Sequence, residues 1–162
     1  MASDTFLLID GIKGESTDDG HKDWIEIDSF NWGVSQAASA TASSQGGAST
    51  QRADFQDLSI VKAMDSSSPL LNKACWGGTH IDKVTLELNR AAGDKKQKYM
   101  VYELFEVFIT SVSVGGGGGI PTESVTFNYG EIKTTYTKQN RKGGGGGGEI
   151  PSGWSLIKNI QL

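Results

Sequence analysis

Residues 57–78, DLSIVKAMDSSSPLLNKACWGG, hold the one clear helix pattern in a chain whose other segments are typical of β-strands. Pro69 stands where a first helical residue belongs, directly after three serines whose hydroxyl groups can cap a helix N-terminus. The apolar residues that follow recur on one helical face: Leu70, Leu71, Ala74 and Cys75. Two glycines then supply a stop. The stretch predicts a short helix from about Pro69 to Trp76, covering an open mouth or edge of a barrel or sandwich.

Strand patterns account for most of the remaining sequence. The segment 24–36, WIEIDSFNWGVSQ, alternates between apolar and polar residues, with a shift of phase near Ser29 of the kind that a β-bulge produces. A second shift of phase, at Gly130, divides another long strand. We therefore expect about eight strands and one helix in a single domain that spans residues 1–162.

The segment 99–114, YMVYELFEVFITSVSV, is the longest apolar stretch, and it carries large side chains on both faces of a strand. A strand of this kind is covered on both faces. One face would meet the core, and the other would meet a second layer or another subunit. A buried helix is the alternative, but the β-branched and aromatic residues favour a strand.

Three segments are predicted to be loops. The segment 37–52, AASATASSQGGASTQR, has too few apolar side chains to pack as a core element, and a loop of this length is usually functional or mobile. The glycine runs 115–119 and 143–148 formally match a GxGxxG search. Strand-like residues follow each run, however, where a phosphate site needs a helix N-terminus. Both runs are therefore expected to be flexible connections.

The composition argues against several classes of protein. A net charge of -4 disfavours a duplex nucleic-acid binder, because counterion release requires clustered cations. No apolar run approaches the roughly 20 residues that cross a bilayer, and the N-terminal residues lack the pattern of an ordinary signal peptide. Cys75 is the single cysteine, so no intrachain disulfide can form. We expect a chain that folds in the cytoplasm and does not insert into a membrane.

Residues with catalytic potential are few and poorly grouped. His21 lies near Asp18, Asp19 and Asp23, but zinc sites usually draw three or four His, Cys or carboxylate ligands with defined spacing. A polar surface turn is the favoured interpretation. No GxSxG elbow accompanies His80. The sequence thus predicts no catalytic, cofactor-binding or metal-binding residues and no enzyme. Its tryptophans leave open a monomeric β-barrel binding module, for example one for carbohydrate.

Four segments then appear in a fixed order: IKGES at 12–16, WIEIDSFNWGVSQ at 24–36, DLSIVKAMDSSSPLL at 57–71 and GWSLIKNIQL at 153–162. This ordered set resembles the hemolysin-coregulated protein (Hcp) family of bacterial type VI secretion. The third segment keeps the family's spacing of Lys62, Asp65, Ser68, Pro69 and Leu71. The resemblance covers nearly the whole chain, and the glycine runs fall where the family tolerates loop variation.

The resemblance implies a closed antiparallel β-barrel of about eight strands with one helix at its side. It implies hexameric rings that stack into a tube, which a contractile sheath surrounds and propels and which carries a spike protein of the VgrG type at its tip. Small effector proteins can travel in the lumen of such rings. A protein of this family needs no signal peptide, because it leaves the cytoplasm through the type VI machine. The family has no catalytic residues to transfer.

The strand pattern and the resemblance together nominate three sets of functional residues. Asn31 lies off the core phase of its strand, so we expect it to face the ring lumen or an exposed surface. The family uses an extended loop to reach another ring, and the matching candidates here are Ala37, Ser44, Gln45, Gly46, Gly47, Gln51 and Arg52. The two-sided strand provides candidates for a subunit interface: Val101, Phe105, Val107 and Ile109.

Overall fold

The computed structural model describes residues 4–37, 52–92, 95–139 and 145–162. Nine strands form one antiparallel sheet: β1 (Asp4–Ile9), β2 (Ile25–Ile27), β3 (Ser29–Asn31), β6 (Leu58–Ala63), β7 (Ile81–Ala92), β8 (Lys95–Gly115), β9 (Thr122–Gln139), β10 (Gly145–Ser155) and β11 (Ile160–Gln161). β4 (Val34–Ser35) and β5 (Asp54–Phe55) pair separately. The helix α1 (Ser68–Gly77) packs beside β8. No helix in the described part of the chain is long and apolar enough to span a bilayer.

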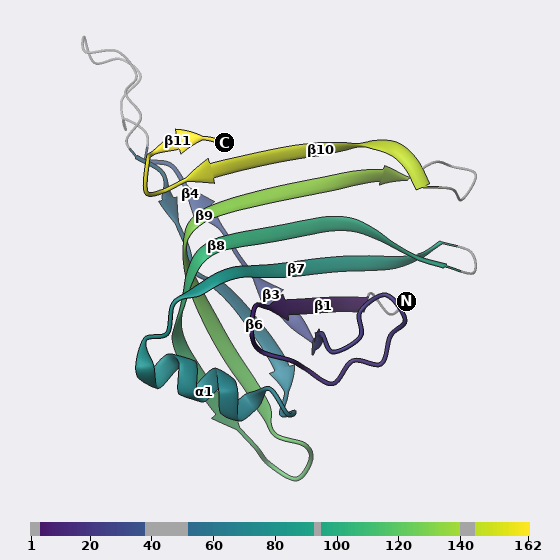
Figure 1. Ribbon diagram of the computed structural model, residues 1–162, viewed down its shortest axis with the longest axis vertical. Coiled ribbons are helices and arrows are strands. Elements are labelled where there is room, and N and C mark those ends of the chain that lie inside the picture. Colours follow the sequence, from purple (N-terminus) through teal and green to yellow (C-terminus); the bar gives the residue numbers. More distant parts are fainter. Residues whose placement is uncertain (1–3, 38–51, 93–94, 140–144) are drawn as a thin grey trace.

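The strands follow the order β11-β10-β9-β8-β7-β1-β2, and β6 pairs with both β9 and β3 (Figure 1). The mainly β class with one short helix and antiparallel pairing is therefore confirmed. The pairing of the described strands does not itself form a closed barrel, so closure stays a prediction. The structure also contains more than the expected eight strands, because several are only two or three residues long.

The segment expected as one long strand, 24–36, is divided into β2, β3 and β4. The shift of phase near Ser29 is confirmed: Ile25 and Ile27 are buried, and Phe30 packs against the core one residue out of step with them. Asp28 marks the break, and its N–H bonds to the carbonyl of Val61 on β6 instead of continuing the β1–β2 ladder.

The longest strands, β8 and β9, bend together at one level (Figure 1). Phe105 pairs with Glu131 and Val107 with Tyr129, so Glu106 and Gly130 face one another between these pairs. Glu106 adopts a positive φ of 54°, which side-chain-bearing residues rarely do. A Cβ on Gly130 would stand 2.7 Å from Ile157 Cδ1, so glycine suits the site. The bend changes which face each strand buries, which confirms the predicted shift at Gly130.

The core follows rows of paired residues across the sheet. On one side of the bend, Ile9, Val84, Leu104, Ile132 and Trp154 are matched strand to strand, and the first four are buried. The row one residue along each strand contains Lys83, Phe105, Glu131 and Ser155, and it lies on the opposite face. We call this opposite side of β1, β7, β8, β9 and β10 the outer face.

The helix begins and ends within a residue of its predicted bounds. Gly78 ends it with a left-handed φ of 57°, and its N–H caps carbonyls of the last turn. Ser67 occupies the N-cap position, yet no side-chain cap bond forms there. Leu71 and Ala74 are buried as predicted, whereas Leu70 is 44% exposed because it lies at the margin of the packed face.

One C-terminal expectation needs correction. The second glycine run was expected to be a connection only, but residues 145–148 belong to β10. After β10 the chain turns at residues 156–159 and returns as β11, so these elements form a hairpin.

Candidate functional site

A cluster of charged side chains is buried where β6, β9 and α1 meet. Lys62 Nζ lies 2.8 Å from Glu123 Oε2 and 2.9 Å from Asp65 Oδ1. Ser68, the first helical residue, donates its hydroxyl proton to Glu123 Oε2 at 2.8 Å and accepts the N–H of Asp65. Both Lys62 and Glu123 are almost fully buried. The cluster joins two strands to the helix start, and its charges are committed to each other, so we assign it a structural role.

A second cluster fastens the loop 11–24 to the outer face. The imidazole of His21 lies between two carboxylates, with Nδ1 2.6 Å from Asp18 Oδ2 and Nε2 2.9 Å from Glu87 Oε1. Its ring also stacks on Phe6 with centroids 4.2 Å apart. Because the loop supplies His21 and β7 supplies Glu87, these contacts hold the loop in place. The favoured interpretation of a polar turn needs one correction, since His21 itself is buried.

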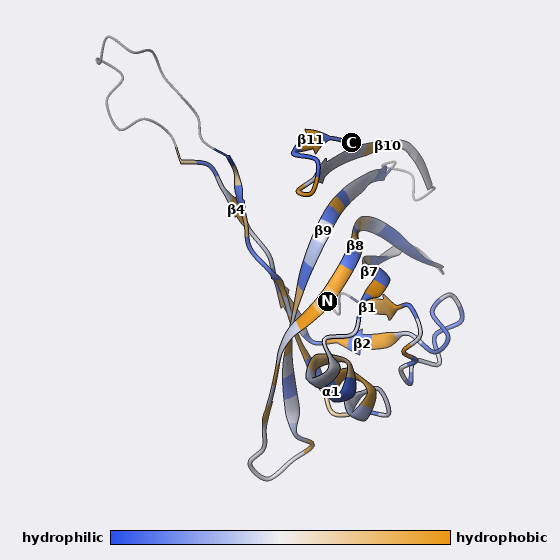
Figure 2. Cartoon of the chain, turned by 60° about the vertical axis from the view of Figure 1, so that its left-hand side comes forward, coloured by the Kyte–Doolittle hydropathy of each residue, from blue (hydrophilic) through white to orange (hydrophobic). Residues whose placement is uncertain are grey.

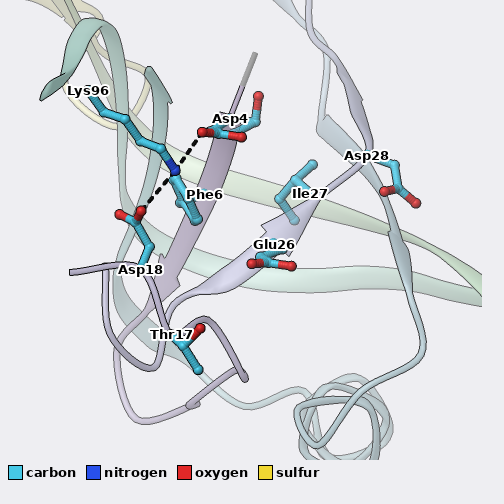
Figure 3. A pocket seen from close by; sticks show the side chains of 9 residues that line it. Asp4, Phe6, Thr17, Asp18, Glu26, Ile27, Asp28 and Lys96 are labelled. Atoms are coloured by element: carbon cyan, nitrogen blue, oxygen red, sulfur yellow. Dashed lines mark hydrogen bonds and ion pairs between the residues drawn. The ribbon is translucent and has the colours of Figure 1, made fainter. Parts of the chain in front are cut away.

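Lys96 continues this cluster and lines an acidic pocket of about 360 Å³, where it lies between Asp4 and Asp18 (Figure 3). Its ammonium group lies 2.8 Å from Asp18 Oδ1 and 2.6 Å from Asp4 Oδ2. The hydrogen bond from Lys96, and then that from His21, lowers the pKa of Asp18. The ionised carboxylate therefore stabilises the fold above the ordinary pKa of aspartate, and this contribution is lost as the pH falls through the lowered value. Among the described residues no group of three or more His, Cys, Asp or Glu side chains could hold a metal ion.

The strands β4 and β5 form an arm that projects from the body of the molecule (Figure 2). Hydrogen bonds fix its base: Trp32 Nε1 donates to the hydroxyl of Tyr129 at 2.5 Å, and that hydroxyl donates to the carbonyl of Gln56 at 2.7 Å. The N–H of Gln56 in turn bonds to the carbonyl of Gly33. One buried tyrosine thus connects the core strand β9 to both sides of the arm.

Burial raises the pKa of Tyr129 to about 12; the Trp32 hydrogen bond opposes this and the charge of Asp57 adds to it. Because the folded-state value exceeds the unfolded value of about 10, this group's stabilisation is complete below pH 10 and is lost as the pH rises through 12.

We expect Tyr129→Phe to lower the free energy of unfolding by about 1–2 kcal/mol at pH 8 through the lost hydrogen bonds. Between pH 10 and 12 the variant should lose less stability than the parent. Urea unfolding at pH 8 and at a pH between 10 and 12 tests this, with exposed Tyr136→Phe as the control. If all three proteins lost the same free energy of unfolding between the two pH values, the prediction would be wrong.

The predicted stacking residues lie mostly outside the described residues: Ser44, Gln45, Gly46, Gly47 and Gln51. Ala37 and Arg52 flank that segment, and both are exposed. The guanidinium of Arg52 donates to the carbonyl of Leu156 in the β10–β11 turn. Asn31 is exposed in β3, between two aromatic residues that pack against the core.

The four interface candidates do not share one face. Val101 and Phe105 are partly exposed on the outer face, where the ammonium groups of Lys83 and Lys133 approach the Phe105 ring to 5.6 and 5.5 Å. Val107 is fully buried and Ile109 is 5% exposed, both inside the chain's own hydrophobic core. The bend at Glu106 is the reason: it turns the later residues of the same sequence phase inward. Val107 and Ile109 are therefore not available at the surface.

Comparison with known proteins connects these features to a family. The family model described as "Type VI secretion system effector, Hcp" matches residues 6–136. The chain is 37% identical to Protein hcp1 of Pseudomonas aeruginosa over 99% of each sequence. A solved structure of a type six secretion system protein superposes with a TM-score of 0.91 at 36% identity, covering 99% of this chain and 100% of that one. Hcp1 from Salmonella typhimurium gives a TM-score of 0.82 at 30% identity, with both chains fully covered. The chain belongs to the Hcp family of type VI secretion proteins.

Proposed function

We propose that this chain is the subunit of the inner tube of a type VI secretion machine. In this proposal six copies form a ring, rings stack into a tube, and a contractile sheath propels the tube with a VgrG-type spike at its tip. The observation that carries the proposal is the full-length relationship to Hcp proteins. The tube protein folds in the cytoplasm and leaves the cell through the machine, and its rings accept small effector proteins.

The proposal includes a protomer whose sheet closes into a barrel. Support comes from the junction of β2 and β3, which are separated by a single residue, Asp28. β2, at one end of the strand order, pairs with β1, and β3 pairs with β6, which in turn pairs with β9, so the two short strands lead from β1 back toward β9. The hydrogen bond from Asp28 N–H to the carbonyl of Val61, at 2.8 Å, bridges the junction.

The arm supports the stacking part of the proposal. Two paired strands that leave the body cannot form a core of their own, so an arm of this kind is suited to contact another molecule. The Tyr129 bonds hold the base of the arm in one orientation. We propose that the segment from Ala37 to Arg52 reaches the adjacent ring, and that Val101 and Phe105 face a neighbouring subunit.

The experiment for the ring is light scattering of the purified protein across a range of concentrations, combined with negative-stain imaging. The expected result is a particle six times the protomer mass and ring-shaped images. A strict monomer at high concentration would contradict the proposal. Free rings without tubes would agree with it, because stacking between isolated rings is expected to be weak.

Asn31 provides a test of the lumen. Its exposed position predicts that Asn31→Lys changes the free energy of unfolding by no more than about 0.5 kcal/mol. Hexamers should remain intact, while the affinity for an effector protein that binds the parent should change. Co-purification and light scattering measure the two effects. Ser35→Lys, on the exposed arm strand, is the matched control; collapse of the fold in Asn31→Lys would show that its face was assigned incorrectly.

A further inference from the structure

We infer that the β10–β11 hairpin of one copy docks in a pocket beside β1 of the next copy. This inference rests on the proposed ring and names the surfaces that build it. The turn of the hairpin and the residues that follow it expose three aliphatic side chains: Ile157 at 60%, Ile160 at 49% and Leu162 at 45%. Solvent-exposed aliphatic groups gathered on one short element commonly mark a contact with another protein.

The three aliphatic residues gather on the outer face. Ile160 pairs with Ser155, which pairs with Glu131 in the outer row. Leu162 lies beside Gly153: a Cβ built on Gly153 would stand 3.1 Å from Leu162 Cβ. Ile157 covers Gly130 at the bend. The hairpin therefore presents a raised aliphatic surface at one end of the strand order.

The pocket opens near the other end of the same strand order. It has a volume of about 600 Å³ and an aliphatic floor that includes Leu8 and Ile12. Leu8 is 39% exposed and pairs with Thr85 on β7. Thr85 in turn pairs with Glu103 on β8, so Leu8 belongs to a row of residues on the outer face. The pocket and the hairpin thus lie toward opposite ends of one curved sheet.

Four of the five charged residues around the pocket have no side-chain partner among the residues that the structure describes, and the fifth, Lys83, pairs with Glu103. Asp10, Lys13, Lys22 and Asp23 line it, and none of their side chains forms an ion pair or hydrogen bond with a described residue. Opposite charges that surround a hollow without pairing across it are available to another molecule. They can satisfy groups of both signs from a partner.

The hairpin offers charges that match this rim. Lys158 stands between Ile157 and Ile160 and is exposed, and Glu131 lies beside the hairpin without an ion-pair partner among the described residues. In the docked arrangement the aliphatic side chains meet the floor formed by Leu8 and Ile12. Lys158 meets Asp10 and Asp23, and Glu131 meets Lys13 and Lys22.

A second copy of this chain is the occupant that satisfies both surfaces at once. A contact between two different surfaces of identical subunits is heterologous, and repetition of it closes a ring when the rotation allows. Pro151 on the adjoining strand β10 lacks an N–H, which disfavours simple addition of another strand at this edge. Side-chain docking beside β11 avoids that restriction.

Charge exchange tests the contact without disturbing a core. We expect Lys158→Asp and Asp10→Lys each to raise the protein concentration needed for half-assembly by about tenfold, as measured by light scattering. The double variant, which restores opposite charges, should assemble within about threefold of the parent. Lys73→Asp, on the exposed side of α1, is the control and should assemble like the parent. Ile160→Asp should weaken assembly more than either single charge exchange.

Cross-linking gives an independent test. In a Cys75→Ser background, Leu8→Cys combined with Ile157→Cys should yield covalent oligomers under mild oxidation, whereas either cysteine alone should not yield a ladder. If the parent forms rings but the charge variants assemble normally and no ladder appears, the docking inference is wrong while the tube function stands. If the parent itself remains monomeric, both the tube function and this contact are wrong. Circular dichroism of each variant establishes that lost assembly is not lost folding.

Discussion

Replacing Lys62 with methionine is expected to lower the free energy of unfolding by about 3–5 kcal/mol. Methionine fills a similar volume, but it leaves Glu123 without the ammonium group that lies 2.8 Å from its carboxylate. Glu123 is only 1% exposed, so water cannot replace that partner. A buried ion left alone costs more than the pair contributes when intact.

The double variant Lys62→Met with Glu123→Leu separates these two effects. Because it removes both charges, it should recover most of the lost stability. Lys83→Met is the matched control: its pair with Glu103, at 3.2 Å, is partly exposed, so about 1 kcal/mol or less should be lost. Urea unfolding at one fixed protein concentration measures all three. A loss below about 1 kcal/mol in Lys62→Met would contradict the role assigned to the cluster.

Gly14→Ala is the second change with a large expected effect, a loss of about 3 kcal/mol in the free energy of unfolding. A Cβ at residue 14 would stand 2.4 Å from the carbonyl oxygen of Trp24 and 2.7 Å from the Cα of Ile25. These are backbone atoms, so no side-chain rotation can relieve the clash. The loop or strand β2 would have to move, and the hydrogen bond from Gly14 N–H to the carbonyl of Asp23, 2.7 Å long, would be disturbed.

The same loop contains a suitable control for Gly14. At Gly20 a Cβ would meet nothing closer than Asp18 Oδ2, at 3.9 Å. Gly20→Ala should therefore change stability by about 0.5 kcal/mol or less. Thermal unfolding followed by circular dichroism distinguishes the two variants. Equal melting temperatures would show that the loop yields more readily than its close approach to β2 suggests.

Local signals allowed the helix to be predicted from sequence alone. Pro69 and the glycines after Trp76 act within a few residues, so the bounds need no knowledge of the rest of the fold. The shift of phase at Gly130 was likewise visible, because glycine interrupts an alternating strand. Glu106, which faces Gly130 on the neighbouring strand, has no sequence feature that indicates a shift of phase. The strand that contains it was therefore predicted without a bend, with Val101, Phe105, Val107 and Ile109 on one face.

The buried charge cluster could not be predicted as a cluster, because Lys62 and Glu123 are 61 residues apart. One signal was nevertheless present. Lys62 continues the alternation of Leu58 and Ile60, and Glu123 precedes Val125 in the same alternation, so each charge occupies an inward phase. A lysine and a glutamate that both point into a core are expected to find each other. The spacing of Lys62, Asp65 and Ser68 places the three in one cluster: Lys62 and Ser68 contact Glu123, and Asp65 pairs with Lys62.

The shared bend of β8 and β9 has a consequence for how the chain unfolds. Each strand, 21 and 18 residues long, continues through the bend and contributes to the core on both sides of it. Neither side can lose its order while the other keeps a complete set of strands. We therefore expect the chain to unfold as a single cooperative unit, and we expect a pull on the arm, whose base bonds to β9, to act on both sides of the bend.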